Sequence, residues 1–146
     1  MYKMFVRPHL EHCVSVWNPS YVGDILAMEK TQNRFTRMLR HGPVLTPQER
    51  NNLLGITSHR DRRLRGDLIN MYKLGEDQRL FRPVVERRTR GHSKKVFLES
   101  TNNNLRRYSF AVRSVREWNA LPENVINAPS LNFFKNRMDR SLFNNR

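Results

Sequence analysis

Apolar residues recur three and four positions apart along most of this chain, in stretches that prolines and glycines interrupt. In residues 22–41, for example, Ile25 and Phe35 fall on one helical face, and Gln32 lies between them on the same face. That spacing is typical of an amphipathic helix, and the Gly-Pro pair that follows it is a strong stop signal. We therefore expect a small, mainly α-helical domain.

Five further segments have helical spacing or a helix-start signal. Pro8 lies inside the first of them, so we expect a kink or a late helix start there. Thr46-Pro47-Gln48-Glu49 is a capping box with proline at the first helical position. The five segments are residues 1–17, 46–54, 58–74, 108–120 and 131–142.

The middle of the chain has a different character. Residues 79–95 carry seven lysines and arginines against the single acid Glu86, and Pro83 and Gly91 interrupt them. This pattern predicts a basic, irregular loop or arm. The sequence of residues 96–98 is compatible with a short strand, so a short β-hairpin is an alternative. We accordingly expect three regions: a helical region at 1–78, a basic arm at 79–107 and a C-terminal helical tail at 108–146.

The formal net charge is +14, and only 38% of the residues are hydrophobic. A charge of this size attracts polyanions, so RNA or DNA is the first partner to consider and an anionic membrane surface the second. No apolar run reaches the roughly 20 residues of a membrane-spanning helix, so we expect no membrane partner. Cys13 is the one cysteine, which favours a reducing, intracellular location in the nucleus or cytoplasm.

The sequence lacks the motifs that the common classes of phosphoryl-transfer enzyme require. No Asp-Asp pair occurs that could hold the two metal ions of a polymerase, and no glycine-rich phosphate loop is present. His9, His12 and Cys13 lie close together, but a structural zinc site needs four ligands, so a partly buried helix face is the better interpretation. We expect no catalytic residue, no metal, no cofactor and no small-molecule substrate.

Phosphate binding is the activity that the residues themselves favour, although a solvated basic loop is the plain alternative. Arginine outnumbers lysine in the arm, and its planar fork suits bidentate phosphate contact. Arginines also load the first half of segment 58–74, where positive charge opposes the helix macrodipole, and such a conflict often marks function. No run of exposed aromatics is visible, so we expect backbone contact more than base stacking. The candidate phosphate-binding residues are Arg60, Arg62, Arg63, Arg65, Arg79, Arg82, Arg87, Arg88, Arg90, Lys94, Lys95, Arg106, Arg107, Arg113 and Arg116.

Three stretches, in this order and spacing, resemble the C-terminal end of LINE-type (non-LTR, jockey-like) retrotransposon reverse transcriptases. The first runs from Tyr2 to Trp17 (Tyr-Lys-x-x-Val-Arg-Pro-His-Leu-Glu-x-Cys-Val-x-Val-Trp), with Glu29-Lys30-x-Gln32 after it. The second is Arg63-Leu-Arg-Gly-Asp-Leu-Ile69 with Tyr72, followed by Thr89-Arg-Gly-His-Ser93. The third joins Phe110-x-x-Arg113-x-Val115-x-x-Trp118-Asn-x-Leu121-Pro to Ala128-Pro-Ser-x-x-x-Phe134-Lys-x-Arg137-x-Asp139.

The resemblance implies a fragment of an RNA-directed DNA polymerase: thumb-like helices at 1–78 and the tail that follows the polymerase. The catalytic palm and the endonuclease would lie upstream of Met1, so we expect no enzyme activity from this chain alone. The first hypothesis is a nucleic-acid-binding fragment that contacts backbone phosphates. The second is a packing module whose apolar faces need the palm domain of the parent polymerase. A soluble, cooperatively folded chain would exclude the second hypothesis.

Overall fold

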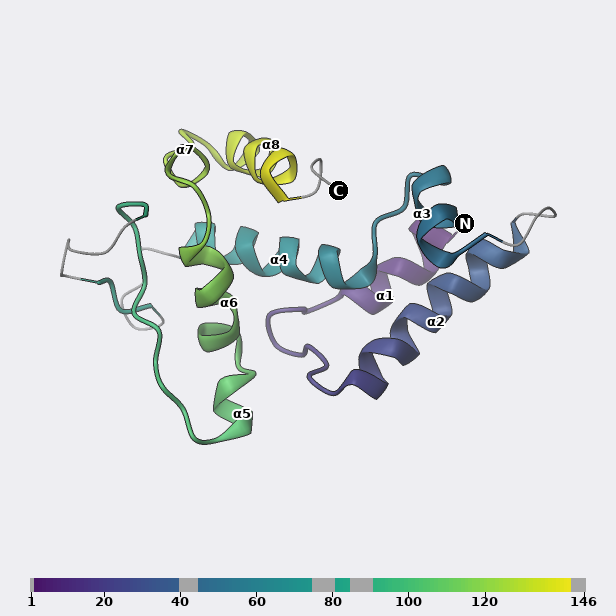
Figure 1. Cartoon of the computed structure of the whole chain (residues 1–146), viewed down its shortest axis with the longest axis horizontal. Helices are drawn as coiled ribbons and strands as arrows, with labels where there is room; N and C mark the ends of the chain where they lie inside the picture. Colours follow the sequence, from purple (N-terminus) through teal and green to yellow (C-terminus); the bar gives the residue numbers. More distant parts are fainter. Residues whose placement is uncertain (1, 40–44, 75–80, 85–90, 143–146) are drawn as a thin grey trace. The chain divides into compact units, whose positions relative to one another are not determined.

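A computed structural model of the chain describes residues 2–39, 45–74, 81–84 and 91–142. Those residues form eight α-helices and one π-helical turn, which confirms the mainly α-helical prediction (Figure 1). In chain order the elements are η1 (Tyr2–Val6), α1 (Arg7–Glu11), α2 (Val22–Met38), α3 (Pro47–Leu53), α4 (His59–Leu74), α5 (Asn104–Arg107), α6 (Phe110–Asn119), α7 (Glu123–Ile126) and α8 (Leu131–Leu142).

The chain divides into two compact units, Met1–Arg65 and Gly66–Arg146. Helix α4 supplies its first residues to the first unit and the remainder to the second. The three regions expected from the sequence rest on charge and on the resemblance, whereas the two units are defined by compactness. The three regions therefore stay a prediction. Among the described residues, no helix combines the length and the apolar character that crossing a bilayer requires.

The first unit has a polar interior. Gln32, which the sequence placed on the inner face of α2, is completely buried, and its side-chain amide N–H groups donate to Asn51 Oδ1 and the Thr57 carbonyl, each at 3.2 Å. The Tyr2 hydroxyl lies 2.8 Å from His59 Nε2, and the Tyr2 ring stacks on Phe35. Buried polar groups must be hydrogen-bonded, so these contacts determine how η1, α2, α3 and α4 meet.

Helix α3 begins as the sequence predicts. The Glu49 backbone N–H donates to the Thr46 hydroxyl, and the Thr46 backbone N–H donates to the Glu49 carboxylate, so the capping box is confirmed. Figure 1 shows α3 beside the C-terminal part of α2. Arg50 makes the contact, because its Nε donates to the Thr36 hydroxyl in the interior at 3.3 Å. Gly55 follows the helix with a φ of +58°, a conformation that glycine adopts without strain.

The first segment is helical from Tyr2 onward, so the late helix start considered for Pro8 does not occur. The chain forms the π-helical turn η1 before Pro8, and the α-helical α1 begins at Arg7, with the proline at the start of the first turn. Proline lacks the N–H that a helix interior requires, so it is tolerated only at such a start. The segment ends by His12, well before Trp17.

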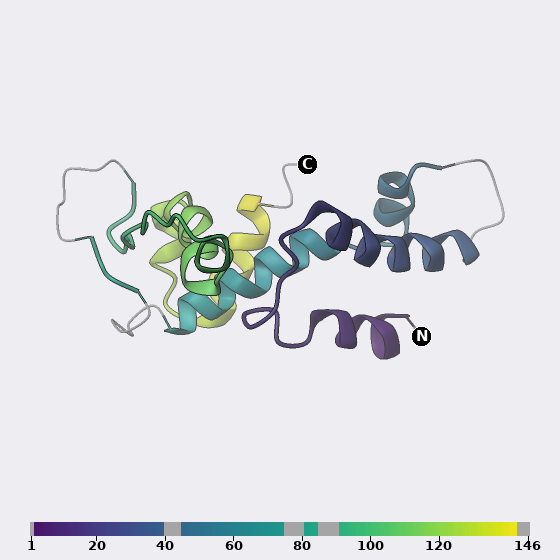
Figure 2. The same ribbon diagram turned by 90° about the horizontal axis from the view of Figure 1, so that it is seen from below.

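The second unit has an apolar interior. Helices α6 and α8 lie beside the second part of α4 (Figures 1 and 2). Tyr72 of α4 stacks on Phe134 of α8 with ring centroids 4.3 Å apart, and its hydroxyl donates to the Ala128 carbonyl at 2.7 Å. The largest wholly buried apolar side chains of this unit are Leu68, Met71, Phe81, Val115, Val125, Ile126, Phe134 and Met138.

The middle segment pairs at a single point. Pro83 and Val96 form an isolated antiparallel bridge, next to which the Phe97 N–H donates to the Arg82 carbonyl at 2.8 Å. Proline has no N–H with which to extend the ladder. Within the described residues, the short β-hairpin left open by the sequence is therefore reduced to one bridge.

Candidate nucleic-acid interface

The arginines at the start of α4 differ in what they face. Arg60 is exposed, whereas the Arg62 guanidinium forms a two-point ion pair with Glu11 of α1, with Nη2 2.7 Å from Oε2. Arg63 is 4% exposed. Its guanidinium donates to Asn18 Oδ1 and the Leu10 carbonyl, each at 2.8 Å, and lies over the Trp17 ring. The positive charge of Arg62 and Arg63 at the start of α4 is thus partly compensated by partners within the first unit.

Glu11 is the anion that balances these arginines. Burial of its carboxyl favours the neutral form, but hydrogen bonds and charge from Arg62 and Arg7 outweigh burial and hold the pKa of Glu11 below its usual range. The Arg7 Nε lies 3.0 Å from the Glu11 carboxylate. A phosphate would have to compete with this carboxylate for Arg62. A phosphate contact by Arg62 or Arg63 stays a prediction, and it would require these bonds to open.

Arg113 has a similar internal role in the second unit. Its Nε and Nη2 donate to the two carboxylate oxygens of Asp67 at 3.0 and 2.9 Å, and its Nη1 donates to the Tyr108 carbonyl. The Asp67 side chain is 5% exposed and that of Arg113 14%. This pair joins α4 to α6, and removing one member would leave a buried charge without its partner.

The other predicted residues lie at the surface or outside the described part. Arg106 is exposed and paired with Glu99 at 2.8 Å, and the Arg107 guanidinium reaches the Thr101 carbonyl at 3.4 Å. Arg65 and Lys95 are half-buried. Four exposed residues have no ion pair within the described part of the chain: Arg60, Arg82, Lys94 and Arg116. Arg79, Arg87, Arg88 and Arg90 lie outside the described residues.

A basic surface that the site prediction omitted lies on the outer face of α2. We call it the α2 basic face: Lys30, Arg34 and Arg37. All three side chains are exposed, and none has a hydrogen bond or ion pair within the described residues. The opposite face of the same helix carries the wholly buried Gln32 and Thr36. Packing of that inner face therefore fixes the direction in which the three cations point.

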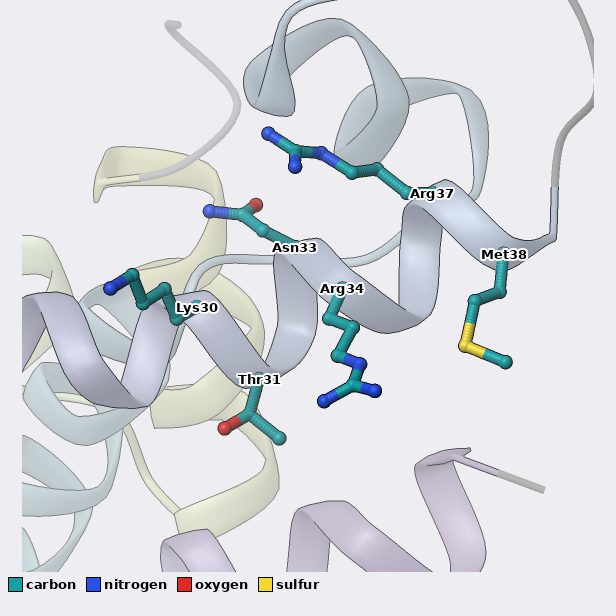
Figure 3. A pocket seen from close by; sticks show the side chains of 6 residues that line it. All are labelled: Lys30, Thr31, Asn33, Arg34, Arg37 and Met38. Carbon is teal, nitrogen blue, oxygen red and sulfur yellow. The ribbon is translucent and has the colours of Figure 1, made fainter.

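These cations line a hollow of about 690 Å³, together with Thr31, Asn33 and Met38. Figure 3 shows the side chains in two rows along the helix, with Lys30, Asn33 and Arg37 on one side and Thr31, Arg34 and Met38 on the other. Each row follows the i, i+3, i+7 spacing, so the rows run along two neighbouring strips of the helix surface. Arg37 and Arg34 belong to different rows and point to opposite sides of the helix in this view.

Helical spacing alone places Lys30, Arg34 and Arg37 opposite the apolar stripe of residues 22–41, although the predicted phosphate-binding residues lie elsewhere. A plain explanation also exists, because cations in the second half of a helix complement its macrodipole. That effect favours positive charge near the helix end, yet it does not require three unpaired cations. The macrodipole therefore accounts for part of this arrangement, and the three exposed cations are candidates for contact with an anion.

The described residues offer no candidate metal site. Within the described ranges, no group of three or more His, Cys, Asp or Glu side chains is placed to hold a metal ion. Cys13 is exposed, and it forms no such group with His9 and His12. Comparison with family models, with curated proteins and with solved structures finds no match to this chain.

Proposed function

We propose that the chain binds RNA or DNA through backbone phosphates, with the α2 basic face as its main contact, and does no catalysis of its own. The observation that carries this proposal is that Lys30, Arg34 and Arg37, exposed and unpaired within the described residues, line the same hollow along α2. A protein with this role would act in the nucleus or cytoplasm, where its partner lies.

The charges support a phosphate ligand over other anions. Both units are basic: residues 1–65 have 11 lysines and arginines against 5 acids, and residues 66–146 have 16 against 8. Contacts that neutralise several phosphates release counterions, and this release drives binding whatever the base sequence. A nucleic acid offers phosphates in series, which suits cations arranged in series along α2.

We further propose that the chain is the C-terminal, thumb-like and post-polymerase part of a LINE-type reverse transcriptase. What supports this origin is the position of the resembling residues, many of which maintain the two interiors. Tyr2 and Gln32 lie at the centre of the first unit, and Asp67, Arg113 and Phe134 hold the second together. A sequence pattern that coincides with such contacts is expected of a region that folds.

Titration of a duplex DNA and a structured RNA across salt concentrations tests the binding proposal. We expect affinity to fall steeply with salt, because every phosphate contact adds roughly 0.9 to the slope of log K against log salt for duplex DNA. The double variant R34A/R37A should weaken binding and reduce that slope by about 2.

The matched control is K73A/R140A, which removes two exposed cations outside α2. Its net charge equals that of R34A/R37A, because each variant loses two positive charges. If this control weakens binding as much as R34A/R37A, attraction is diffuse and the α2 basic face is not the contact. A wild-type chain that binds neither nucleic acid at low salt would overturn the proposal as a whole.

A second candidate function follows from apolar side chains that the first unit leaves in solvent. Met4 and Phe5 of η1 are 71% and 62% exposed, and Val22 and Leu26 of α2 are 71% and 59% exposed. Such residues suit a packing module that docks against the palm domain of the parent polymerase. Strong binding of an apolar dye by the isolated chain, with no cooperative unfolding transition, would favour this function over nucleic-acid binding.

A further inference from the structure

An aromatic ring stands in solvent on the arm of the second unit. Phe97 is 52% exposed, whereas its neighbour Val96 is 6% exposed. Asn119 of α6 fixes Val96 by accepting its N–H at 3.0 Å and donating to its carbonyl at 2.7 Å. Trp118 Nε1 fixes the same strand-like segment two residues earlier by donating to the Lys94 carbonyl at 2.9 Å.

These anchors determine where the Phe97 ring points. Successive residues of an extended segment point in opposite directions, so burying Val96 directs Phe97 outward. The Phe97 N–H donates to the Arg82 carbonyl at 2.8 Å, which brings the other half of the arm alongside. The Arg82 guanidinium carbon lies 5.6 Å from the centre of the Phe97 ring. The ring is thus held in a fixed position beside a cation, with about half its surface free.

We propose that Phe97 is a stacking platform for an unpaired base of single-stranded nucleic acid, with Arg82 beside its ring to contact a flanking phosphate. The inference rests on the proposed nucleic-acid binding and specifies the form of the partner. Aromatic side chains beside cations are the usual means of binding single strands, because every base has a π-face that can stack. In a duplex that face is already covered by the neighbouring base pairs.

Charge is the reason to choose a nucleic acid over an apolar protein surface as the occupant. Within residues 81–84 and 91–98 the charged residues are Arg82, Lys94 and Lys95, and the Glu123 carboxylate of α7 accepts the Ser93 N–H at 2.8 Å next to Lys94 in the chain. The next acid along the chain, Glu99, is paired with Arg106 at 2.8 Å. An apolar partner would have to desolvate these cations, whereas a single strand supplies the phosphates that neutralise them.

The test compares an unstructured oligonucleotide with its duplex form for the wild type and three variants. F97A should weaken single-strand binding roughly 5- to 100-fold, the effect of losing one stacked base, and change duplex binding less than about twofold. F97Y keeps a ring and should bind as the wild type does. L98A is the matched control, because Leu98 is a similarly exposed apolar residue of the same segment.

A fluorescent variant gives a second readout. The indole of F97W should be quenched when the single strand is added, beyond any change from Trp17 and Trp118 in the wild type. If the wild type binds both forms and F97A leaves single-strand affinity unchanged, or lowers both affinities equally, the stacking inference fails and the phosphate proposal stands. If the wild type binds neither form, both fail.

Discussion

The two units of this chain have interiors of opposite chemistry. The first encloses the polar side chains of Gln32, His59 and Arg63, and the second encloses Leu68, Met71 and Phe134. Apolar burial is stabilising wherever it occurs, because it depends little on direction. Buried polar groups contribute only when each is paired, and a missing partner costs about 1–3 kcal/mol. The second unit should therefore tolerate small shifts that the first does not.

The difference also explains where positive charge is available. In the first unit, Arg62 and Arg63 are drawn inward by Glu11 and Asn18, so the arginine-rich start of α4 mainly maintains the fold. The α2 basic face has no such partner within the described residues and remains open to a ligand. Counting arginines along a segment is thus a poorer guide to phosphate binding than asking which of them already have an anion.

The largest expected effect is on the apolar interior. Phe134→Ala removes a ring with no exposed surface that contacts Tyr72 and Trp118, and it should lower the free energy of unfolding by about 3–5 kcal/mol. Urea unfolding measures the loss, and amide hydrogen exchange locates it. Faster exchange confined to residues 66–146 would show that the units unfold separately. Equal loss of protection in residues 1–65 would contradict that separation.

A smaller loss is expected in the polar interior. Glu11→Gln keeps the shape of the side chain but removes the charge that Arg62 and Arg7 share, so it should cost about 2 kcal/mol. Urea unfolding monitored by Trp17 fluorescence is the measurement, because Trp17 lies in the same unit, under the Arg63 guanidinium. Glu29→Gln is a useful control, since Glu29 accepts one exposed backbone N–H from Arg60. Equal losses for the two variants would remove any special role for Glu11.

Acidification should weaken the first unit before the second. Burial, which outweighs the opposing effect of Glu29 and Glu11, lowers the pKa of His59 from 6.5. The unfolded chain then binds a proton more readily, so stability is full above pH 6.5 and falls as pH drops below it. The pKa of Glu11 is also lowered, from 4.5, so its contribution is lost as pH falls through the folded value.

Unfolding followed by Trp17 fluorescence from pH 7.5 to 4 should therefore show a decline that begins near pH 6.5 and continues below pH 4.5. Glu11→Gln should flatten the lower part of the curve and enlarge the decline that begins near pH 6.5, because Glu11 opposes the lowering of the His59 pKa. A curve that stays flat between pH 7 and 5 would mean that His59 accepts a proton in the folded unit without cost.

Sequence reasoning succeeded where the signal is local and failed where it depends on long-range contact. The capping box at Thr46 and Glu49 needs no information beyond four residues, and it was predicted correctly. Gln32 could be assigned to the inner face of α2 by spacing alone. The burial of Arg63 could not, because its partners Asn18 and Leu10 are 45 and 53 residues away. The exposure of Phe97 could not be predicted either, because it depends on the contacts by which Asn119 anchors Val96.

The smallest expected change in stability belongs to the surface that we propose as the binding site. R34A/R37A removes exposed side chains with no intramolecular partner among the described residues, so the free energy of unfolding should change by less than about 0.5 kcal/mol. Alanine has the higher helix propensity, and this partly offsets the weaker interaction with the helix end. Urea unfolding of the variant beside the wild type makes the measurement. A loss near that of Glu11→Gln would mean that the α2 basic face maintains the fold, and any accompanying loss of nucleic-acid affinity would then have to be attributed to unfolding.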